Sequence, residues 1–272
     1  MDPALQRRVQ RYGWDKASNY YETYWLKQLA PAQDELLGIA DLRAGERVLD
    51  VACGTGLVSF KVASIVGAGG FVVGTDISEK MVEFCRQRAN KDKLHNLSFE
   101  RMDGEELEPD LGLFDKAICA LGLMYMPEPV KALREMRKLL RPGGSTSVLV
   151  WGRRERCGWY NLFDIVEKRA TSDVCPMFFS LGNPGMLPLS FEKSGYMMVE
   201  AKTIDATLHF DSAADACGAA FAGGPVALVY HKFNESVKDE VHREYLASIA
   251  QYENDTGYDI PGEFVIAKGL NS

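Results

Sequence analysis

The segment Val48-Leu49-Asp50-Val51-Ala52-Cys53-Gly54-Thr55-Gly56 joins a short apolar run to two closely spaced glycines. Its first five residues are typical of a buried strand, and the apolar residues of 57–66 predict the helix that follows. Glycine at 54 and 56 removes Cβ where the backbone bends between strand and helix. Backbone N–H groups at the start of a helix favour an anionic or electron-rich group, so this turn is a candidate ligand site.

Short apolar runs alternate with segments of helical period from Arg47 to Trp151, which is the pattern of repeated βαβ units and a parallel sheet. The sequence predicts strands at 48–52, 71–76, 97–102, 115–121, 145–151, 197–210 and 263–268. It predicts helices at 57–66, 78–90, 129–140, 187–193, 212–222 and 235–252. The fold class predicted is therefore α/β, with a doubly wound, seven-stranded, mostly parallel sheet.

Three of these elements have expected boundary residues. Ser78 is expected to be the N-cap of helix 78–90. Pro142, Gly143 and Gly144 are expected to end helix 129–140, and Pro261 and Gly262 to precede the last strand.

Composition and charge argue against several classes of protein. The net charge of −7 disfavours binding to a phosphate backbone, so no nucleic-acid partner is expected. The basic run Arg153, Arg154 and Arg156 is interpreted as a solvated loop, with contact to an anionic substrate as the alternative. No run of about 18 apolar residues is present, which predicts a cytoplasmic protein without membrane association. The cysteines, at 53, 85, 119, 157, 175 and 217, form no Cys-x-x-Cys pair, so reduced thiols and no metal site are expected.

The glycine turn by itself is a weak signal for a nucleotide site. Its context strengthens the prediction, because Asp76 ends the next strand, where a carboxylate could accept hydrogen bonds from two ribose hydroxyls. A dinucleotide oxidoreductase is the rival interpretation. It requires a third glycine where Ser59 stands and usually an apolar residue where Asp50 stands, so the fingerprint disfavours a nicotinamide cofactor.

Four motifs in order resemble those of the class I S-adenosylmethionine (SAM)-dependent methyltransferases, in particular the branch of the ubiquinone and menaquinone C-methyltransferases. They are VLDVACGTG (48–56), GTDISEKMVEFCRQRA (74–89), MDGEELE (102–108) and LREMRKLLRPGG (133–144). The resemblance covers roughly residues 45–151 and implies a Rossmann-like methyltransferase fold. It also implies an enzyme that uses SAM and releases S-adenosylhomocysteine (SAH).

The resemblance implies a role for individual residues toward SAM. Asp50 would lie near the amino group, the backbone of Gly54 and Gly56 near the ribose, Asp76 on the ribose hydroxyls and Leu121 near the sulfonium. Ile77, Met102 and Asp103 would surround the adenine, with Asp103 accepting from its exocyclic amine, and Tyr20 or Tyr21 would touch the methionine part. Ala52 stands where the family has its first glycine, and its small side chain is expected to require only adjustment.

The resemblance also organises the chain as one domain, residues 1–272. Residues 1–44 would form N-terminal cover helices and 45–152 the SAM-binding core. Residues 153–185 and 211–258 would be insertions at strand ends that form a helical and aromatic substrate cap. The cap would offer an aromatic wall for a planar or lipophilic acceptor, made of Trp151, Trp159, Tyr160, Phe178, Phe179, Phe221 and Tyr230.

The sulfonium of SAM already activates the methyl group, so positioning, which can supply about 7 to 11 kcal/mol, makes a dedicated catalytic residue optional. A phenol or an activated carbon would benefit from a general base, for which Tyr21, Tyr125 and His209 are the candidates, with Tyr20 and His231 weaker. No metal is required.

The predicted function is methylation of a small-molecule acceptor. A nucleic-acid or protein methyltransferase is the first alternative, although Ala120-Leu121-Gly122-Leu123-Met124-Tyr125 stands in place of the Asn/Asp-Pro-Pro-Tyr run of the base-amine methyltransferases. A SAM-binding regulator without turnover is the second. The residues indicate neither the acceptor atom nor an oligomeric state.

Overall fold

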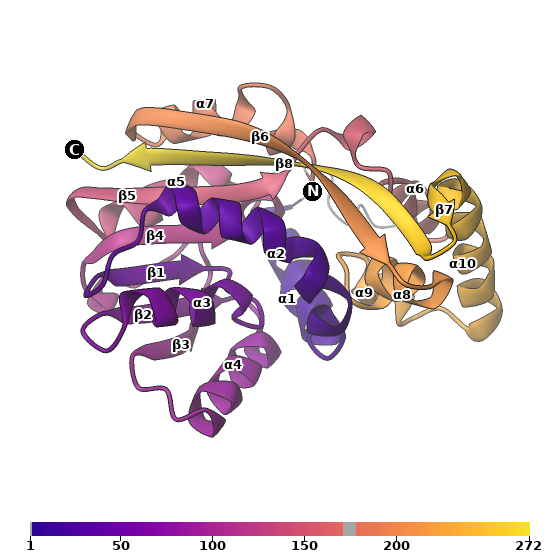
Figure 1. Ribbon diagram of the computed structural model, residues 1–272, viewed down its shortest axis with the longest axis horizontal. Coiled ribbons are helices and arrows are strands. Elements are labelled where there is room, and N and C mark those ends of the chain that lie inside the picture. Colours follow the sequence, from indigo (N-terminus) through magenta and orange to yellow (C-terminus); the bar gives the residue numbers. More distant parts are fainter. Residues whose placement is uncertain (1, 171–177) are drawn as a thin grey trace.

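The computed structural model describes residues 2–170 and 178–272, in which one eight-stranded sheet organises the chain (Figure 1). The strand order is β3-β2-β1-β4-β5-β8-β6, and the short β7 pairs with β8 outside this path. The strands are β1 (Arg47–Val51), β2 (Phe71–Asp76), β3 (Leu97–Arg101), β4 (Phe114–Ala120), β5 (Leu140–Trp151), β6 (Met197–Phe210), β7 (Glu253–Asn254) and β8 (Gly257–Leu270).

The sheet is doubly wound and mostly parallel, as the sequence predicted. Strands β1 to β5 pair in parallel, whereas β8 lies antiparallel between β5 and β6. Because β1 has β2 on one side and β4 on the other, the direction of winding reverses between β1 and β4. In open α/β sheets such a switch point leaves a crevice at the carboxyl ends of the strands.

Helices cover both faces of the sheet. Figure 1 shows α2 and α3 in front of the sheet and α5 and α7 behind it. The helices are α1 (Pro3–Ala17), α2 (Tyr21–Ala40), α3 (Leu57–Val66), α4 (Glu79–Lys91), α5 (Pro129–Lys138), α6 (Asn161–Glu167), α7 (Met186–Lys193), α8 (Ala213–Cys217), α9 (Ala227–Tyr230) and α10 (Glu235–Ile249).

Strands β6 and β8 extend beyond the end of β5 and lead to a group of helices, α6 and α8 to α10, at one side of the sheet (Figure 1). Helix α1 lies between this group and the sheet, and it contacts both α9 and α4. Buried apolar side chains form one continuous cluster that runs from Leu49 of β1 to Tyr245 of α10.

Helix 129–140 was predicted too long. The helix ends at Lys138, and Leu140 already pairs with Phe114 at the start of β5. The N–H of Phe114 donates to the carbonyl of Leu139 at 2.8 Å, so pairing with β4 replaces the last helical turn. Pro142, Gly143 and Gly144 lie inside β5, where the register with β4 shifts.

The last strand was predicted too short. Strand β8 begins at Gly257, so Pro261 and Gly262 lie within it. The carbonyl of Pro261 accepts from the N–H of Gly158 at 2.8 Å, so it points away from β6. The nitrogen of Pro261, which carries no proton, points to the same side. The ladder between β6 and β8 consequently loses no hydrogen bond at this proline.

Other predictions differ at their ends. Ser78 caps α4, its side chain accepting from the N–H of Met81, as predicted. The expected helix 212–222 is α8 followed by one π-helical turn, Gly218–Ala222, and the helix expected at 235–252 ends as the 3₁₀ turn Ala250–Tyr252. Helices α6 and α9 were not predicted.

The cysteines that the structure describes are free and buried; Cys175 lies outside the described residues. Among the helices of residues 2–170 and 178–272, none is long and apolar enough to cross a membrane.

Candidate functional site

A cavity, here called the first cavity, lies at the carboxyl ends of β1 to β4, at the switch point of the sheet. Its walls come from these strand ends and from helix α1. Seven of the ten residues predicted to bind a cofactor line it: Ala52, Gly54, Asp76, Ile77, Met102, Asp103 and Leu121.

The three other predicted residues lie outside this lining. Tyr20 is 39% exposed, with its ring 6.1 Å from that of His231, and its neighbour Tyr21 lines the cavity instead. Gly56 lies behind the turn at the start of α3, with a φ of 83° that favours glycine. Asp50 is buried beneath the turn.

The glycine turn is built from left-handed backbone conformations. Ala52, Gly54 and Gly56 have φ values of 57°, 55° and 83°. Alanine at 52 is accommodated because Gly122 faces it: a Cβ added to Gly122 would lie 2.3 Å from the Cβ of Ala52. The departure of Ala52 from the family's glycine can be seen in the sequence, but its contact with Gly122 cannot.

Asp76 holds the turn from the end of β2. One carboxylate oxygen accepts from the N–H of Gly54 and the other from the N–H of Ser78, both at 2.8 Å. Burial raises the pKa of Asp76 to about 6. Each carboxylate oxygen has a further lone pair, so the side chain can still accept from the hydroxyls of a ligand in the cavity.

Asp50 is 1% exposed. One of its carboxylate oxygens accepts from the hydroxyl of Ser59 at 2.5 Å, and the other has no hydrogen-bond partner among the described residues. Burial raises the pKa of Asp50 to about 7. A buried carboxylate oxygen without a partner is costly, and a cationic group nearby would stabilise its charged form.

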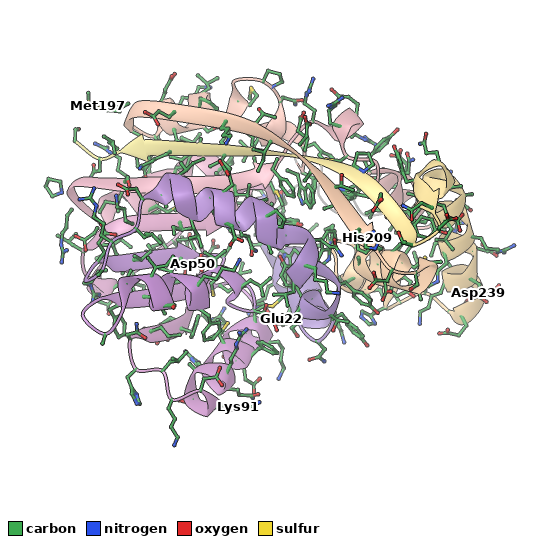
Figure 2. All side chains as sticks on the ribbon, in the orientation of Figure 1. Glu22, Asp50, Lys91, Met197, His209 and Asp239 are labelled. Atoms are coloured by element: carbon green, nitrogen blue, oxygen red, sulfur yellow. The ribbon has the colours of Figure 1, made fainter. Side chains whose placement is uncertain are left out.

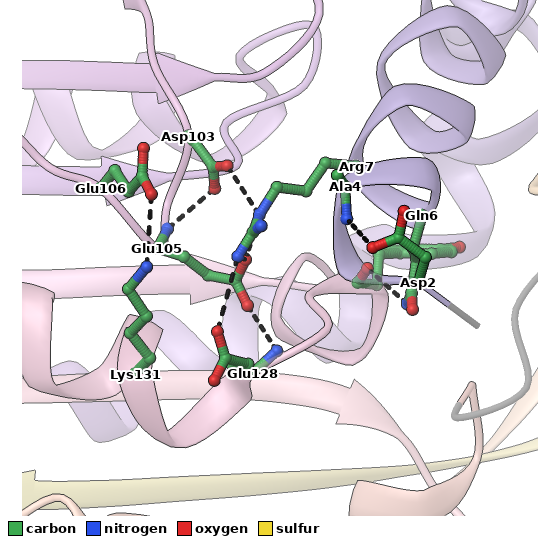
Figure 3. Close-up of polar contacts among 10 residues, drawn as sticks. Asp2, Ala4, Gln6, Arg7, Asp103, Glu105, Glu106, Glu128 and Lys131 are labelled. Atoms are coloured by element: carbon green, nitrogen blue, oxygen red, sulfur yellow. Dashed lines mark hydrogen bonds and ion pairs between the residues drawn. The ribbon is translucent and has the colours of Figure 1, made fainter.

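Helix α1 is joined to the first cavity by polar contacts (Figure 3). The guanidinium of Arg7 forms ion pairs with Glu105 and with Asp103, the latter at 3.1 Å, and Glu105 is fully buried. The side chain of Gln6 donates to the carbonyl of Tyr125 at 3.2 Å. Arg7, Gln10 and Trp14 also line the first cavity but were not predicted to do so, because the sequence of an amphipathic helix does not indicate where its polar face will dock.

A second cavity lies beside the first, and α6, the π-helical turn Gly218–Ala222 and α10 contribute to its walls. The two cavities share Trp14, Tyr21, Leu121 and Tyr125 as wall residues, so they meet at these side chains. None of the described residues that line the second cavity carries a charge. The cavity is therefore suited to an apolar, uncharged ligand.

The expected aromatic wall is partly present in the second cavity. Trp151, Trp159 and Phe178 line it, together with Trp25 and Phe210, which were not predicted. Tyr160, Phe179, Phe221 and Tyr230 do not line it. Phe221 and Tyr230 instead stack on each other, with their ring centroids 5.4 Å apart.

The candidate general bases fall in different places. Tyr21 and Tyr125 lie at the junction of the cavities, and burial raises the pKa of Tyr21, so its hydroxyl keeps its proton at neutral pH. His209 lies near the end of β6, where β6 and β8 extend beyond β5, and is far from Asp50 (Figure 2). Its imidazole contacts Asp259 at 2.6 Å and Asp211 at 3.1 Å, and it lines neither cavity. His231 lines neither cavity either.

The doubly wound sheet, with its last long strand antiparallel between β5 and β6 and a ligand cavity at its switch point, defines a class I methyltransferase fold. A solved structure supports this: phosphoethanolamine N-methyltransferase 2 of Haemonchus contortus in complex with SAM superposes with a TM-score of 0.62 at 18% identity. The alignment covers 94% of this chain and 57% of that protein.

Residues 42–152 match the model of a family described as a methyltransferase domain. The demethylmenaquinone methyltransferase of Listeria welshimeri is 32% identical over 130 residues, which are 48% of this chain and 55% of that protein. The ubiquinone/menaquinone biosynthesis C-methyltransferase UbiE of Ectopseudomonas mendocina is 39% identical over 116 residues, 42% of this chain and 45% of that protein.

This chain thus spans about half the length of these relatives. Residues 42–152 are similar to a methyltransferase domain, and the resemblance to the ubiquinone and menaquinone branch of the class I methyltransferases is confirmed.

Proposed function

We propose that this chain transfers a methyl group from SAM to a small lipophilic acceptor. The observation that carries the proposal is the junction of two unlike cavities, one bordered by the glycine turn and carboxylates, the other apolar. Leu121 and Tyr125 belong to both walls, so ligands in the two cavities would meet there. The two relatives named as quinone methyltransferases support an acceptor of low polarity.

The residues of the first cavity fit SAM. Asp76 would accept from the ribose hydroxyls, Ile77 and Met102 would pack on the adenine, and Asp103 would accept from its amine. The unpartnered oxygen of Asp50 beneath the turn would stabilise the positive amino group through the field of its charge. Bound SAM supplies a methyl group that its sulfonium has already activated.

The protein's contribution to the reaction would be positioning and exclusion of water. Trp14 and Tyr21 line both cavities, and their rings make an edge contact at 5.7 Å, so they can enclose the junction from the side of α1 and α2. Tyr21, protonated at neutral pH, can donate a hydrogen bond to an acceptor oxygen but does not act as a base there. Alignment of the two ligands would then supply most of the rate enhancement.

The domain organisation belongs to the same proposal. Residues 1–44 would cover the SAM site, 45–152 would bind SAM, and 153–185 with 211–258 would cap the acceptor. The walls of the two cavities support this division: Trp14 and Tyr21 come from the first segment, and Leu121 and Tyr125 come from the second. Trp159 and Pro225, which line the second cavity alone, come from the proposed cap.

Two measurements test the proposed function. SAM and SAH should each raise the melting temperature of the purified chain, and incubation with labelled SAM and a metabolite extract should yield SAH together with a methylated small molecule. Label found only in protein or RNA would favour a macromolecular methyltransferase, and binding of SAM without formation of SAH would favour a regulator. A folded chain that responds to neither SAM nor SAH would refute the proposal.

A further inference from the structure

We infer that the second cavity selects an uncharged ring compound that carries a carbonyl-type oxygen, which the indole N–H groups of Trp25 and Trp159 bind. The inference rests on the proposed function in that it takes this cavity to be the acceptor site. It adds the chemical group that the acceptor must carry and the two residues that recognise it.

Two hydrogen-bond donors in the wall of this cavity have no partner among the residues that the structure describes. Trp25 and Trp159 are 7% and 3% exposed, and both line the cavity. The indole nitrogen of each is buried and makes no hydrogen bond to any described residue. Most buried polar groups in native proteins are paired, and an indole N–H can only donate, so the missing partner is an acceptor atom.

The positions of both indoles are fixed by a third. The ring of Trp151 lies 6.1 Å from that of Trp25 and 4.8 Å from that of Trp159, in edge contacts at 66° and 65°. Trp151 itself stacks on Phe264, with centroids 4.2 Å apart and planes 25° apart. Because Trp25 and Trp159 flank one anchored ring, their donors are held in place before a ligand binds, which reduces the entropy lost on binding.

The rest of the wall decides the charge of the ligand. It consists of apolar and aromatic side chains, small alanines and glycines, and tyrosines, and no described lining residue carries a charge. An anion or cation moved into such a site would lose its hydration without gaining an ion pair. A neutral carbonyl loses less hydration and gains the indole hydrogen bond, so a ketone or a similar oxygen acceptor on an apolar ring fits best.

The test compares three probes of similar size: α-tetralone, a ring ketone; tetralin, the same skeleton without the oxygen; and 1-naphthoate, an aromatic anion. Affinities are measured by ligand-observed NMR titration of the full chain, with and without SAH. α-Tetralone is expected to bind at least fivefold more tightly than tetralin, and 1-naphthoate to bind more weakly than either.

The variants Trp25→Phe and Trp159→Phe keep an aromatic ring and remove the N–H. At least one should bring the ratio of α-tetralone to tetralin affinity close to one, while tetralin affinity changes by less than about twofold. Trp14→Phe is the matched control, because Trp14 lines the cavity but its indole nitrogen is not among the unpaired buried donors. In this variant the ratio of α-tetralone to tetralin affinity should equal that of the natural chain.

A merely structural role of the two indoles would lower both affinities together and leave the ratio unchanged, which would overturn the inference. Equal binding of α-tetralone and tetralin by the natural chain, or tighter binding of 1-naphthoate, would also overturn it. Failure of SAM and SAH to bind would instead overturn the proposed function, and the ketone ratio measured without SAH would still test the inference on its own.

Discussion

Ala52 and Gly122 share a space that holds only one side chain. Ala52 directly follows β1 and has a left-handed conformation, which costs a residue with a Cβ about 1–2 kcal/mol. Its methyl group occupies the position that a side chain at Gly122 would need. The alanine that departs from the family's glycine is therefore linked to a glycine on the neighbouring strand end.

Gly122→Ala is expected to destabilise the fold by about 1–3 kcal/mol, the usual cost of overpacking. Adding Ala52→Gly to the same chain should recover most of this loss, because it removes the opposing methyl group. Urea unfolding of the single and double variants measures the coupling. Gly38→Ala is the control, since a Cβ at that helical position meets no atom within 4 Å; simple addition of the two single effects would contradict the pairing.

Asp76→Ala is expected to weaken SAH binding more than tenfold. The variant removes the acceptor proposed for the ribose hydroxyls, whose charge-assisted hydrogen bonds are worth about 1.5–3 kcal/mol each, and it releases the N–H of Gly54. Calorimetry measures the affinity. Glu100→Gln is the matched control, because it changes an exposed carboxylate on β3 that pairs with Arg86 of α4. Unchanged affinity in a folded Asp76→Ala chain would refute the ribose assignment.

Asp50 makes the stability of the chain depend on pH. Its pKa is about 7 in the folded state and 3.8 as the ordinary value, so the folded state holds the proton more tightly. Its contribution to stability is fully present below pH 3.8 and is lost as the pH rises through 7.

Asp50→Asn should remove this dependence and keep an acceptor for Ser59. Between pH 5 and pH 8 the natural chain should lose about 2–3 kcal/mol of unfolding free energy relative to the variant. Denaturant unfolding at several pH values measures the difference. Because both chains retain Asp76, the comparison isolates Asp50, and a constant difference across this range would contradict the prediction.

At the level of elements, separated polar contacts join α1 to the end of β3 and the start of α4, and Trp14 of α1 packs on Tyr125. Arg7 pairs with the carboxylates after β3, and Asp15 accepts from the hydroxyl of Ser78 at 2.7 Å and from the N–H of Lys80 at 3.2 Å at the start of α4. Polar contacts of this kind can break without disrupting the core. We therefore expect α1 to open when the ligand in the first cavity exchanges.

Arg7→Met is expected to speed SAH dissociation several-fold and to weaken binding to a similar extent, because it breaks the contact with Glu105 and Asp103 but keeps the aliphatic stem. Stopped-flow displacement measures the rate. Arg8→Met changes the next, exposed arginine of the same helix and should leave the rate unchanged. Equal rates in the natural chain and both variants would mean that α1 does not control exchange.

For the whole molecule, the sheet and the helices α8 to α10 are continuous. The long strands β6 and β8 belong to the sheet at one end and lead to these helices at the other (Figure 1). The two cavities share lining residues, and α1 contacts both α4 and α9. These connections favour a single unit of unfolding over two independent ones.

The natural chain is therefore expected to melt in one calorimetric transition. SAH at one hundred times its dissociation constant should move that whole transition upward by several degrees, which corresponds to about 2.7 kcal/mol of stabilisation. Two transitions, of which SAH moves only one, would contradict the single-domain prediction.

Local patterns were sufficient for most of the sheet. Strands β2 and β6 and helix α3 have the predicted bounds, because in each the apolar residues recur with a clear period and turn residues stand at both ends. The failures lie where long-range pairing competes with local preference. Local sequence preference would end a strand at Pro261, yet β8 stays paired with β6 through this residue. Leu140 continues the apolar stripe of the preceding helix, yet it pairs with Phe114 of β4 as the first residue of β5.

The glycine turn and the strand-end carboxylates could be located in advance because a strand, a turn and a helix in sequence define them, and parallel strands bring their ends to one edge. The walls of the cavities could not. Arg7, Trp14, Trp25 and Trp159 lie on segments far apart in the chain, and only the packing of α1, α2 and the cap around the sheet brings them to the ligand sites. Hydrophobic periodicity shows that such side chains will be buried, but it does not show which buried side chains will meet.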